Sequence, residues 1–167
     1  MGLATFIGGI HPYEGKELSE DKPIKYLEPL QGEIMVYPLS QHIGAPAKPL
    51  VAKGDHVLKG QIIAEAGGFI SANVLSSVSG TVKGIESKLV ANGAMVQSIL
   101  VENDGEEEAI EGFGTDRDAS KLSKEEIRQI VKDAGIVGLG GAGFPTHVKL
   151  SPKEPDKIDH ILVNGAE

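Results

Sequence analysis

The sequence contains no cysteine and no tryptophan, and only 4% of its 167 residues are aromatic. Without cysteine, the chain forms no disulfide, no thiolate zinc site and no cysteine-ligated iron–sulfur cluster of its own. Thiol usage therefore gives no indication of the redox compartment. The fold must rest on packing and hydrogen bonds alone.

Basic residues are the minority, with 16 Lys and Arg against 24 Asp and Glu and a net charge of -8. Nucleic-acid binding needs a clustered basic face that neutralises phosphates, so this charge balance excludes nucleic acid as a partner. Long apolar runs are missing too, because no stretch approaches the roughly 20 residues of a membrane span. The N-terminus also lacks the basic and apolar regions of a signal peptide. We expect no transmembrane segment.

Glycine, in contrast, is abundant, with 22 residues, nearly twice the usual share of about 7%. Its first use lies in residues 33–102, where the β-type runs IMVYPL, QIIAEA, GTVKGI and SILVEN alternate with turn signals. This spacing is typical of a small all-β sandwich or barrel. Residues 51–57 (VAKGDHV) recur as residues 90–96 (VANGAMV). The repeat predicts a quasi-twofold β module in which Gly54 and Gly93 occupy positive-φ turn positions.

The regions around this module follow from composition and spacing. Residues 1–32 mix apolar positions with turn formers and predict an irregular arm, whereas residues 103–121 are acidic and glycine-rich and predict a solvated linker. A helix follows, because Ser123 and Glu126 fit an S-x-x-E capping box and Gly135 fits the position after a helix end.

The chain ends on HILVNGAE, residues 160–167, which resembles an apolar strand running into a turn without a cap. We interpret the chain as the N-terminal part of a longer protein that has been cut inside a domain. On this interpretation, the chain lacks cysteine because of where it was cut, and the whole protein would contain cysteine further along.

The second use of glycine is a cluster in residues 135–143, where five of nine residues are glycine. Gly138, Gly140 and Gly143 fit G-x-G-x-x-G, but the motif follows a helix rather than a strand, which argues against a Rossmann fingerprint. It is no P-loop either, because Phe144 stands where the lysine must be. Residues without Cβ still let backbone N–H groups approach a phosphate or a flat ring. Composition leaves two alternatives open, a ligand loop and a plain connection.

This cluster is part of a longer resemblance. GLGGAGFPT at residues 138–146, with Lys149 behind it and VNGAE at residues 163–167, resembles the flavin-binding signature of the NADH-oxidising subunit of respiratory complex I. GGIHP, PLSQHIGAPAKPLV, KGDHVLKGQIIAEAGGFISANVLSSVSGTV and GIVGLGGAGFPTHVKL resemble the C subunit of the Rnf ion-translocating electron-transport complex. The resemblance spans nearly the whole chain.

The resemblance implies both a fold and a function. The fold is mixed α+β, with a barrel-sandwich hybrid of the biotinyl and lipoyl type followed, in residues 122–167, by the start of an α/β flavin-binding domain. Members of the family take electrons from NADH onto a non-covalent FMN and pass them to 4Fe-4S clusters. The complex couples this traffic with ferredoxin to ion movement. The implied location is the cytoplasmic face of the cell membrane, where other subunits hold the protein.

The resemblance also implies site residues. The loop residues would wrap the FMN, Lys149 would lie at its phosphate, Phe144 would face the nicotinamide, and two late residues would lie near the isoalloxazine or ribityl part; the set is Gly138, Gly140, Gly141, Gly143, Phe144, Lys149, Asn164 and Glu167. At Ala166 the sequence departs from the complex I relative, which has an acidic residue there. The cluster cysteines and the second half of the flavin domain lie downstream in the family. We therefore expect this chain alone to bind FMN weakly or not at all, and to be inactive.

The β module has a competing interpretation as a cofactor carrier. In carrier domains an exposed hairpin tip presents a modifiable lysine, and the corresponding tip here falls at residues 68–70, which are Gly, Phe and Ile. A swinging-arm function is therefore not expected. A carrier-like fold without its lysine is instead suited to docking or scaffolding within a larger redox complex, which is the alternative function.

Histidine suggests no metal site, because no two of the five histidines stand three or four residues apart. His147 follows the glycine cluster directly, and we expect it to hydrogen bond to the backbone of that loop. Hydride transfer between NADH and FMN needs no side-chain nucleophile or general base, so the sequence predicts no catalytic residue.

Overall fold

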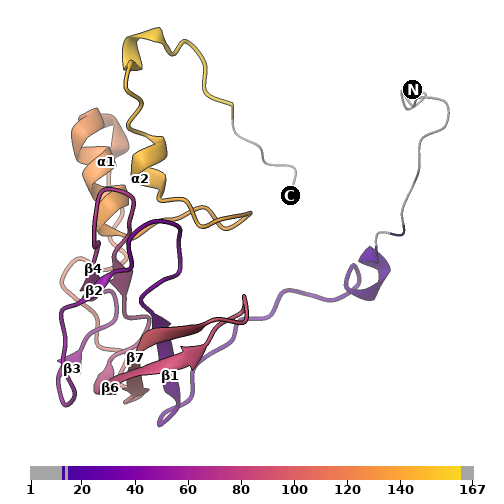
Figure 1. Cartoon of the computed structure of the whole chain (residues 1–167), viewed down its shortest axis with the longest axis vertical. Helices are drawn as coiled ribbons and strands as arrows, with labels where there is room; N and C mark the ends of the chain where they lie inside the picture. The colour runs from indigo at the N-terminus through magenta and orange to yellow at the C-terminus, as the bar shows by residue number, and fades with distance from the viewer. Residues whose placement is uncertain (1–12, 14, 163–167) are drawn as a thin grey trace.

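The computed structural model describes residue 13 and residues 15–162. A β module forms the base, and helices α1 (Lys124–Asp133) and α2 (Thr146–Lys149) stand above it. The N-terminal arm extends away to one side (Figure 1). This is the mixed α+β architecture expected from the sequence. Within the described residues, no helix has the length and apolar character needed to cross a membrane.

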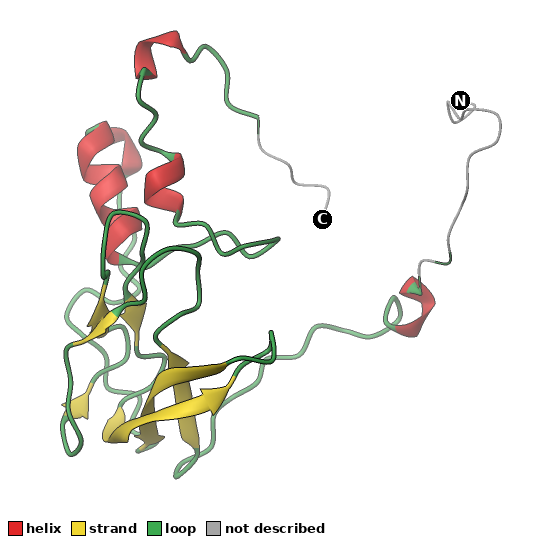
Figure 2. Ribbon diagram, viewed as in Figure 1, coloured by secondary structure: helices red, strands yellow, loops and turns green. Residues whose placement is uncertain are grey.

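The β module consists of two small antiparallel sheets (Figure 2). The four-stranded sheet has the order β1-β7-β6-β3 and the three-stranded sheet has the order β2-β4-β5. Their bounds are β1 (Ile34–Pro38), β2 (Lys48–Pro49), β3 (His56–Val57), β4 (Ile62–Glu65), β5 (Val74–Leu75), β6 (Gly80–Leu89) and β7 (Met95–Asn103). Each of the four predicted β runs overlaps one of the longer strands, and β6 and β7 extend beyond their runs.

One apolar core lies within the module. Val57, Ile63, Val78, Ile99 and Val101 are fully buried there. Burying a side chain of this size contributes about 1.5–3 kcal/mol, so the short strands are held by their common core rather than by their length. The core is confined to the β module, because none of the described helices contains a fully buried residue.

The predicted turns of the repeat are present. Gly54 and Gly93 have φ values of 98° and 82°. A Cβ at either position would meet nothing within 4 Å, so backbone conformation rather than space requires glycine there. The first copy leads into β3, and the second joins β6 to β7.

The segments outside the module are partly tied to it. The described part of the arm includes the 3-10 turn Lys16–Leu18. The end of the arm is held by Asn103 of β7, which donates hydrogen bonds of 3.1 Å to the carbonyls of Pro29 and Leu30. The acidic segment is exposed, as expected for a linker, yet the N–H of Lys59 donates to the carbonyl of Glu108 at 2.8 Å. It then reaches the 3-10 turn Ala119–Lys121.

The C-terminal end departs from the prediction. After the 3-10 turn Pro155–Lys157, residues 160–162 form no strand, and Ile161 and Leu162 are 81% and 96% exposed. A strand is stabilised by pairing with a neighbour, and no described strand pairs with these residues. The predicted strand is therefore wrong for residues 160–162, and residues 163–167 lie outside the described part.

Candidate functional site

Helix α1 leads into the glycine cluster, and local chemistry defines both of its ends. Ser123 Oγ accepts the N–H of Glu126 at 3.2 Å, and Glu126 Oε2 accepts the N–H of Ser123 at 2.8 Å. This is the predicted capping box. Gly135 follows the helix with φ 63°, which confirms the predicted glycine after its end. The helix therefore stops where the loop must begin.

The end of α1 also lies against the β4–β5 hairpin. A Cβ on Gly135 would collide with the carbonyl oxygen of Asn73, so glycine is required there for contact as well as for conformation. The hairpin tip is exposed at Phe69, 75% accessible, which agrees with the tip predicted at residues 68–70. The ring of His147, in α2, interacts with the backbone of Phe69, which acts against the lowering of its pKa by burial. Within the described residues, the expected hydrogen bond from this ring to the glycine loop is not found; its partner instead comes from the hairpin, which is distant in sequence.

The glycine loop is closed at its base. The N–H of Thr146 donates to the carbonyl of Ile136 at 2.9 Å, and the N–H of Gly138 donates to the carbonyl of Phe144 at 3.0 Å. Pro145, between these bonds, is fully buried. Residues 139–142 form an exposed turn at the tip, which contains Gly140. A firmly held base thus presents a bare backbone turn to solvent.

Two glycines of the loop have different requirements. Gly143 has φ 65°, and its Cβ would lie 2.7 Å from the carbonyl oxygen of Gln41. Gly141 has no such φ, and a Cβ there would meet nothing within 4 Å. The fold therefore requires glycine at position 143 but not at position 141. The missing side chain at Gly141 leaves open space beside the loop.

Lys149 lies across the base of this loop. Its Nζ would be 2.5 Å from a Cβ on Gly138, so the absence of a side chain on Gly138 lets the ammonium approach the loop backbone. Phe144 is half-buried, and its carbonyl takes part in closing the loop. Asn164 and Glu167, the remaining predicted site residues, lie outside the described part of the chain.

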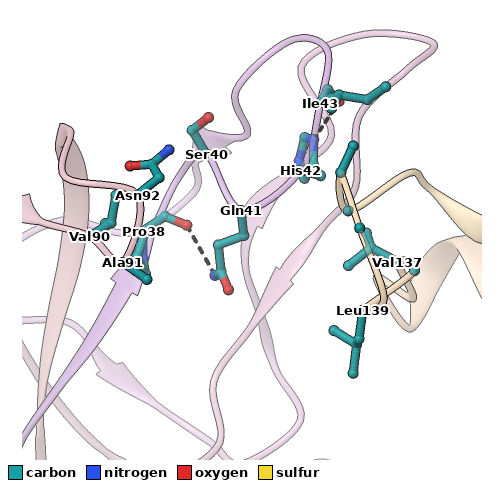
Figure 3. Close-up of a pocket in the computed structure, with 14 residues that line it drawn as sticks. Pro38, Ser40, Gln41, His42, Ile43, Val90, Ala91, Asn92, Val137 and Leu139 are labelled. Atoms are coloured by element: carbon teal, nitrogen blue, oxygen red, sulfur yellow. Dashed lines mark hydrogen bonds between the residues drawn. The ribbon is translucent and has the colours of Figure 1, made fainter. Parts of the chain in front are cut away.

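A cleft of about 580 Å³ separates the loop from the β module (Figure 3). Its lining comes from three segments: Pro38 with residues 40–43, residues 90–92 at the β6–β7 turn, and residues 137–139 with 141–143 of the loop. Four predicted glycines therefore lie in one short loop, three of which line the cleft. Phe144 and Lys149 are not among the lining residues.

The β-module wall was not predicted from the sequence. Gln41, His42 and Asn92 lie far from the loop along the chain, and only the fold brings them to the cleft. One sequence feature could have indicated it: the first repeat copy carries Lys53, and the second carries uncharged Asn92 at the same place. The copy that faces the loop therefore lacks the lysine charge of the first copy.

The histidines at this site are held by hydrogen bonds. His42 Nε2 lies 3.1 Å from the N–H of Ala72, which can only donate, so Nε2 accepts and Nδ1 carries the proton toward the Ile43 carbonyl at 2.9 Å. Burial lowers the pKa of His147, and the positive charge of Lys132 lowers it further, whereas the bond to Phe69 opposes both. Of the two histidines, only His42 lines the cleft.

Comparison with known families agrees with this arrangement. Residues 4–106 match the RnfC barrel sandwich hybrid domain. The chain belongs to this family. Residues 131–167 match the Nuo51 FMN-binding domain, a region that begins in α1 and includes the whole glycine loop. The two matches confirm the resemblance and the barrel-sandwich fold. One wall of the cleft lies in the first matched region and the other wall in the second.

Curated relatives extend the match over the whole chain. It is 44% identical over 165 residues to the C subunit of the proton-translocating ferredoxin:NAD(+) oxidoreductase complex of Clostridium ljungdahlii, covering 99% of this chain and 36% of that protein. It is 43% identical over 166 residues to the Na(+)-translocating counterpart of Acetobacterium woodii, covering 98% and 36%. The C subunit of an ion-translocating oxidoreductase complex of Pseudomonas aeruginosa is 41% identical over 167 residues, covering 99% and 21%. The chain thus spans about a third or less of each relative.

Proposed function

We propose that the chain is the N-terminal part of a subunit of an ion-translocating ferredoxin:NAD oxidoreductase complex. In this function, electrons from NADH pass through FMN to 4Fe-4S clusters that belong to the downstream part of the subunit, and ferredoxin is an indirect partner. The names of the relatives and the match of residues 131–167 to an FMN-binding domain support the proposal. The other subunits of the complex would hold the protein at the cytoplasmic face of the membrane.

The observation that supports this function best is the open space at Gly141 on a closed loop. A glycine that the fold does not require is explained if a ligand occupies the place of its side chain. Lys149, placed over Gly138, would neutralise the phosphate of that ligand. The residues present therefore fit FMN.

The roles of this chain are binding and orientation. Bound FMN would supply acceptance of hydride from NADH and onward electron transfer. The loop backbone would hold the flavin, Lys149 its phosphate, and the half-buried Phe144 would limit water at the base of the loop. Gly140, Asn164 and Glu167 would also contact the FMN, and Phe144 would face the nicotinamide.

The test uses a chain extended to the full length of the relatives, purified and assayed for flavin by absorbance. We expect the extended chain to retain FMN and Gly141→Leu to lose it, because leucine fills the open space. Ala52→Leu, which places the same side chain on an exposed turn of the β module, is the control. Unchanged flavin content in Gly141→Leu would overturn the proposal.

The present chain provides a second measurement. We expect it to bind FMN weakly or not at all, because only its residues 131–167 match the flavin-binding domain. Quenching of flavin fluorescence with micromolar affinity would contradict this expectation.

A docking function is the second candidate, and the arm favours it. Ile24, Tyr26 and Leu27 are 95–97% exposed, an apolar stretch that globular surfaces seldom leave uncovered. In this function the β module and its arm bind other subunits. Deleting residues 13–28 from the extended chain should then impair assembly with those subunits while flavin content stays unchanged, which separates the two functions.

A further inference from the structure

The cleft has no charged wall, and this restricts what it can bind. None of the described residues that line it is Asp, Glu, Lys or Arg, and both ring nitrogens of His42 are engaged in hydrogen bonds to the backbone. Lys149 approaches the loop at Gly138 but does not line the cleft. A phosphate would therefore have no counter-charge from these residues inside the cleft. An uncharged part of a ligand fits it better.

The glycine-loop wall is suited to a flat group. Gly138, Gly141 and Gly143 bring bare backbone to the cleft, and Gly141 has nothing near its missing side chain. Leu139, 93% exposed, adds an apolar surface beside them. A planar ring could lie against such a wall at van der Waals distance, whereas a longer side chain at Gly141 would hold it away.

The β-module wall offers two amides that complement each other. Gln41 uses its Nε2 for the carbonyl of Pro38 at 3.1 Å, and in the described part of the chain its Oε1 accepts no hydrogen bond. Asn92 uses its Oδ1 for the N–H of Ala94 at 2.9 Å, which leaves its Nδ2 hydrogens for a ligand. Figure 3 shows Gln41 between Asn92 on one side and Leu139 on the other. One amide thus offers an acceptor and the other a donor.

We propose that the β module forms part of the ligand site, with Gln41 and Asn92 binding the edge of a flat, uncharged nitrogen heterocycle that lies on the glycine loop. An edge with adjacent N–H and C=O groups matches the free acceptor and the free donor. The isoalloxazine of an oxidised flavin and the dihydronicotinamide of NADH, through its carboxamide, share this chemistry. The inference rests on the proposed function and adds to it a role for the barrel-sandwich domain.

The second repeat copy agrees with this role. Lys53, Asp55 and His56 of the first copy are replaced by Asn92, Ala94 and Met95 in the second, so all three ionisable side chains are absent from the copy whose turn lines the cleft. A turn that only joins two strands does not require uncharged side chains. A turn that contacts an uncharged ring does require them, because a buried unpaired charge is unfavourable.

The experiment uses the extended chain with riboflavin and FMN as probes. Gln41→Met removes the amide at similar length, and Asn92→Asp keeps the acceptor for Ala94 while replacing the donor by a charge. We expect each to weaken riboflavin and FMN equally, by about three- to tenfold, the size of one hydrogen bond. Lys149→Met should weaken FMN but not riboflavin. Gln97→Met, on the exposed part of β7, is the control.

The outcomes distinguish the two rings and the two proposals. If flavin affinity is unchanged but the KM for NADH rises by a similar factor in Gln41→Met and Asn92→Asp, the ring is the nicotinamide. If neither changes while the extended chain still retains flavin, this inference is overturned and the proposed function stands. If the extended chain retains no flavin at all, the proposed function itself fails. Thermal unfolding of each variant shows whether the fold is intact.

Discussion

The side-chain nitrogen of Asn73 lies 3.4 Å from the carbonyl oxygen of Asp133, so a residue of the β4–β5 hairpin caps the end of helix α1. The same nitrogen lies 3.5 Å from the carbonyl of Lys132, and Asn73 Oδ1 accepts the N–H of Ala66 at 2.9 Å. Helix ends leave carbonyls without partners in the helix, and here the β module satisfies them. The hairpin whose tip carries a lysine in carrier domains instead orients the helix before the glycine loop.

We expect Asn73→Ala to lower the free energy of unfolding by about 1 kcal/mol, because the helix carbonyls and the N–H of Ala66 lose a partner. Asn73→Asp keeps the acceptor for Ala66 but places a negative charge at the negative end of the helix dipole, so it should also destabilise. Urea unfolding of the present chain measures both. Stability of Asn73→Asp equal to that of the wild type would contradict the capping role.

The two loop glycines are expected to respond differently to alanine. Gly143→Ala should destabilise the chain by about 2 kcal/mol or more, because its φ is left-handed and a Cβ would press on the Gln41 carbonyl. Gly141→Ala should change stability by less than about 0.5 kcal/mol, since nothing lies near the new methyl group. Thermal unfolding of the two variants compares them directly. Equal losses would show that the loop packs differently from this structure.

Asp104 links stability to pH. The hydrogen bond from Ser79 Oγ, 2.6 Å from Asp104 Oδ1, lowers the pKa of this carboxyl, and the N–H of Glu106 and the ring of His56 lower it further. Its folded pKa is therefore below its unfolded value of about 3.9, so the stabilisation is fully present above the unfolded pKa and is lost as the pH falls through the folded pKa. We expect the wild type to lose more stability than Asp104→Asn between pH 6 and pH 3.

Denaturant unfolding across this range provides the measurement. Ser79→Ala, which removes the strongest cause of the shift, should reduce the acid-dependent loss while lowering stability at every pH. Parallel pH profiles for the wild type and Asp104→Asn would exclude a contribution from this carboxylate.

Several local features could be predicted from sequence because they depend on close neighbours. The capping box joins Ser123 and Glu126 across one helical turn, and the left-handed φ of Gly54, Gly93 and Gly135 belongs to turns a few residues long. In each case the interacting groups lie within one element, so sequence spacing is also spatial spacing. The hairpin tip near Phe69 was located instead by the correspondence with carrier domains.

Features that depend on distant segments were missed. The partner of His147 is the backbone of Phe69, 78 positions earlier in the numbering. Residues 160–162 look like a strand in sequence, but no described strand pairs with them. The amides of Gln41 and Asn92 reach the cleft through the order of strands in the four-stranded sheet, which local pattern does not determine.

By itself, the sequence determined the strand runs, the capped helix and the position of the glycine loop, because each depends on interactions over a few residues. Only the tertiary structure decided that Gly143 is needed for packing while Gly141 leaves space, and that the β module forms the other wall of the cleft. The close approach at Gly143 and the cleft wall both involve Gln41, about a hundred residues before the loop. The position of Gln41 is set by the core of the module, and no local pattern encodes it.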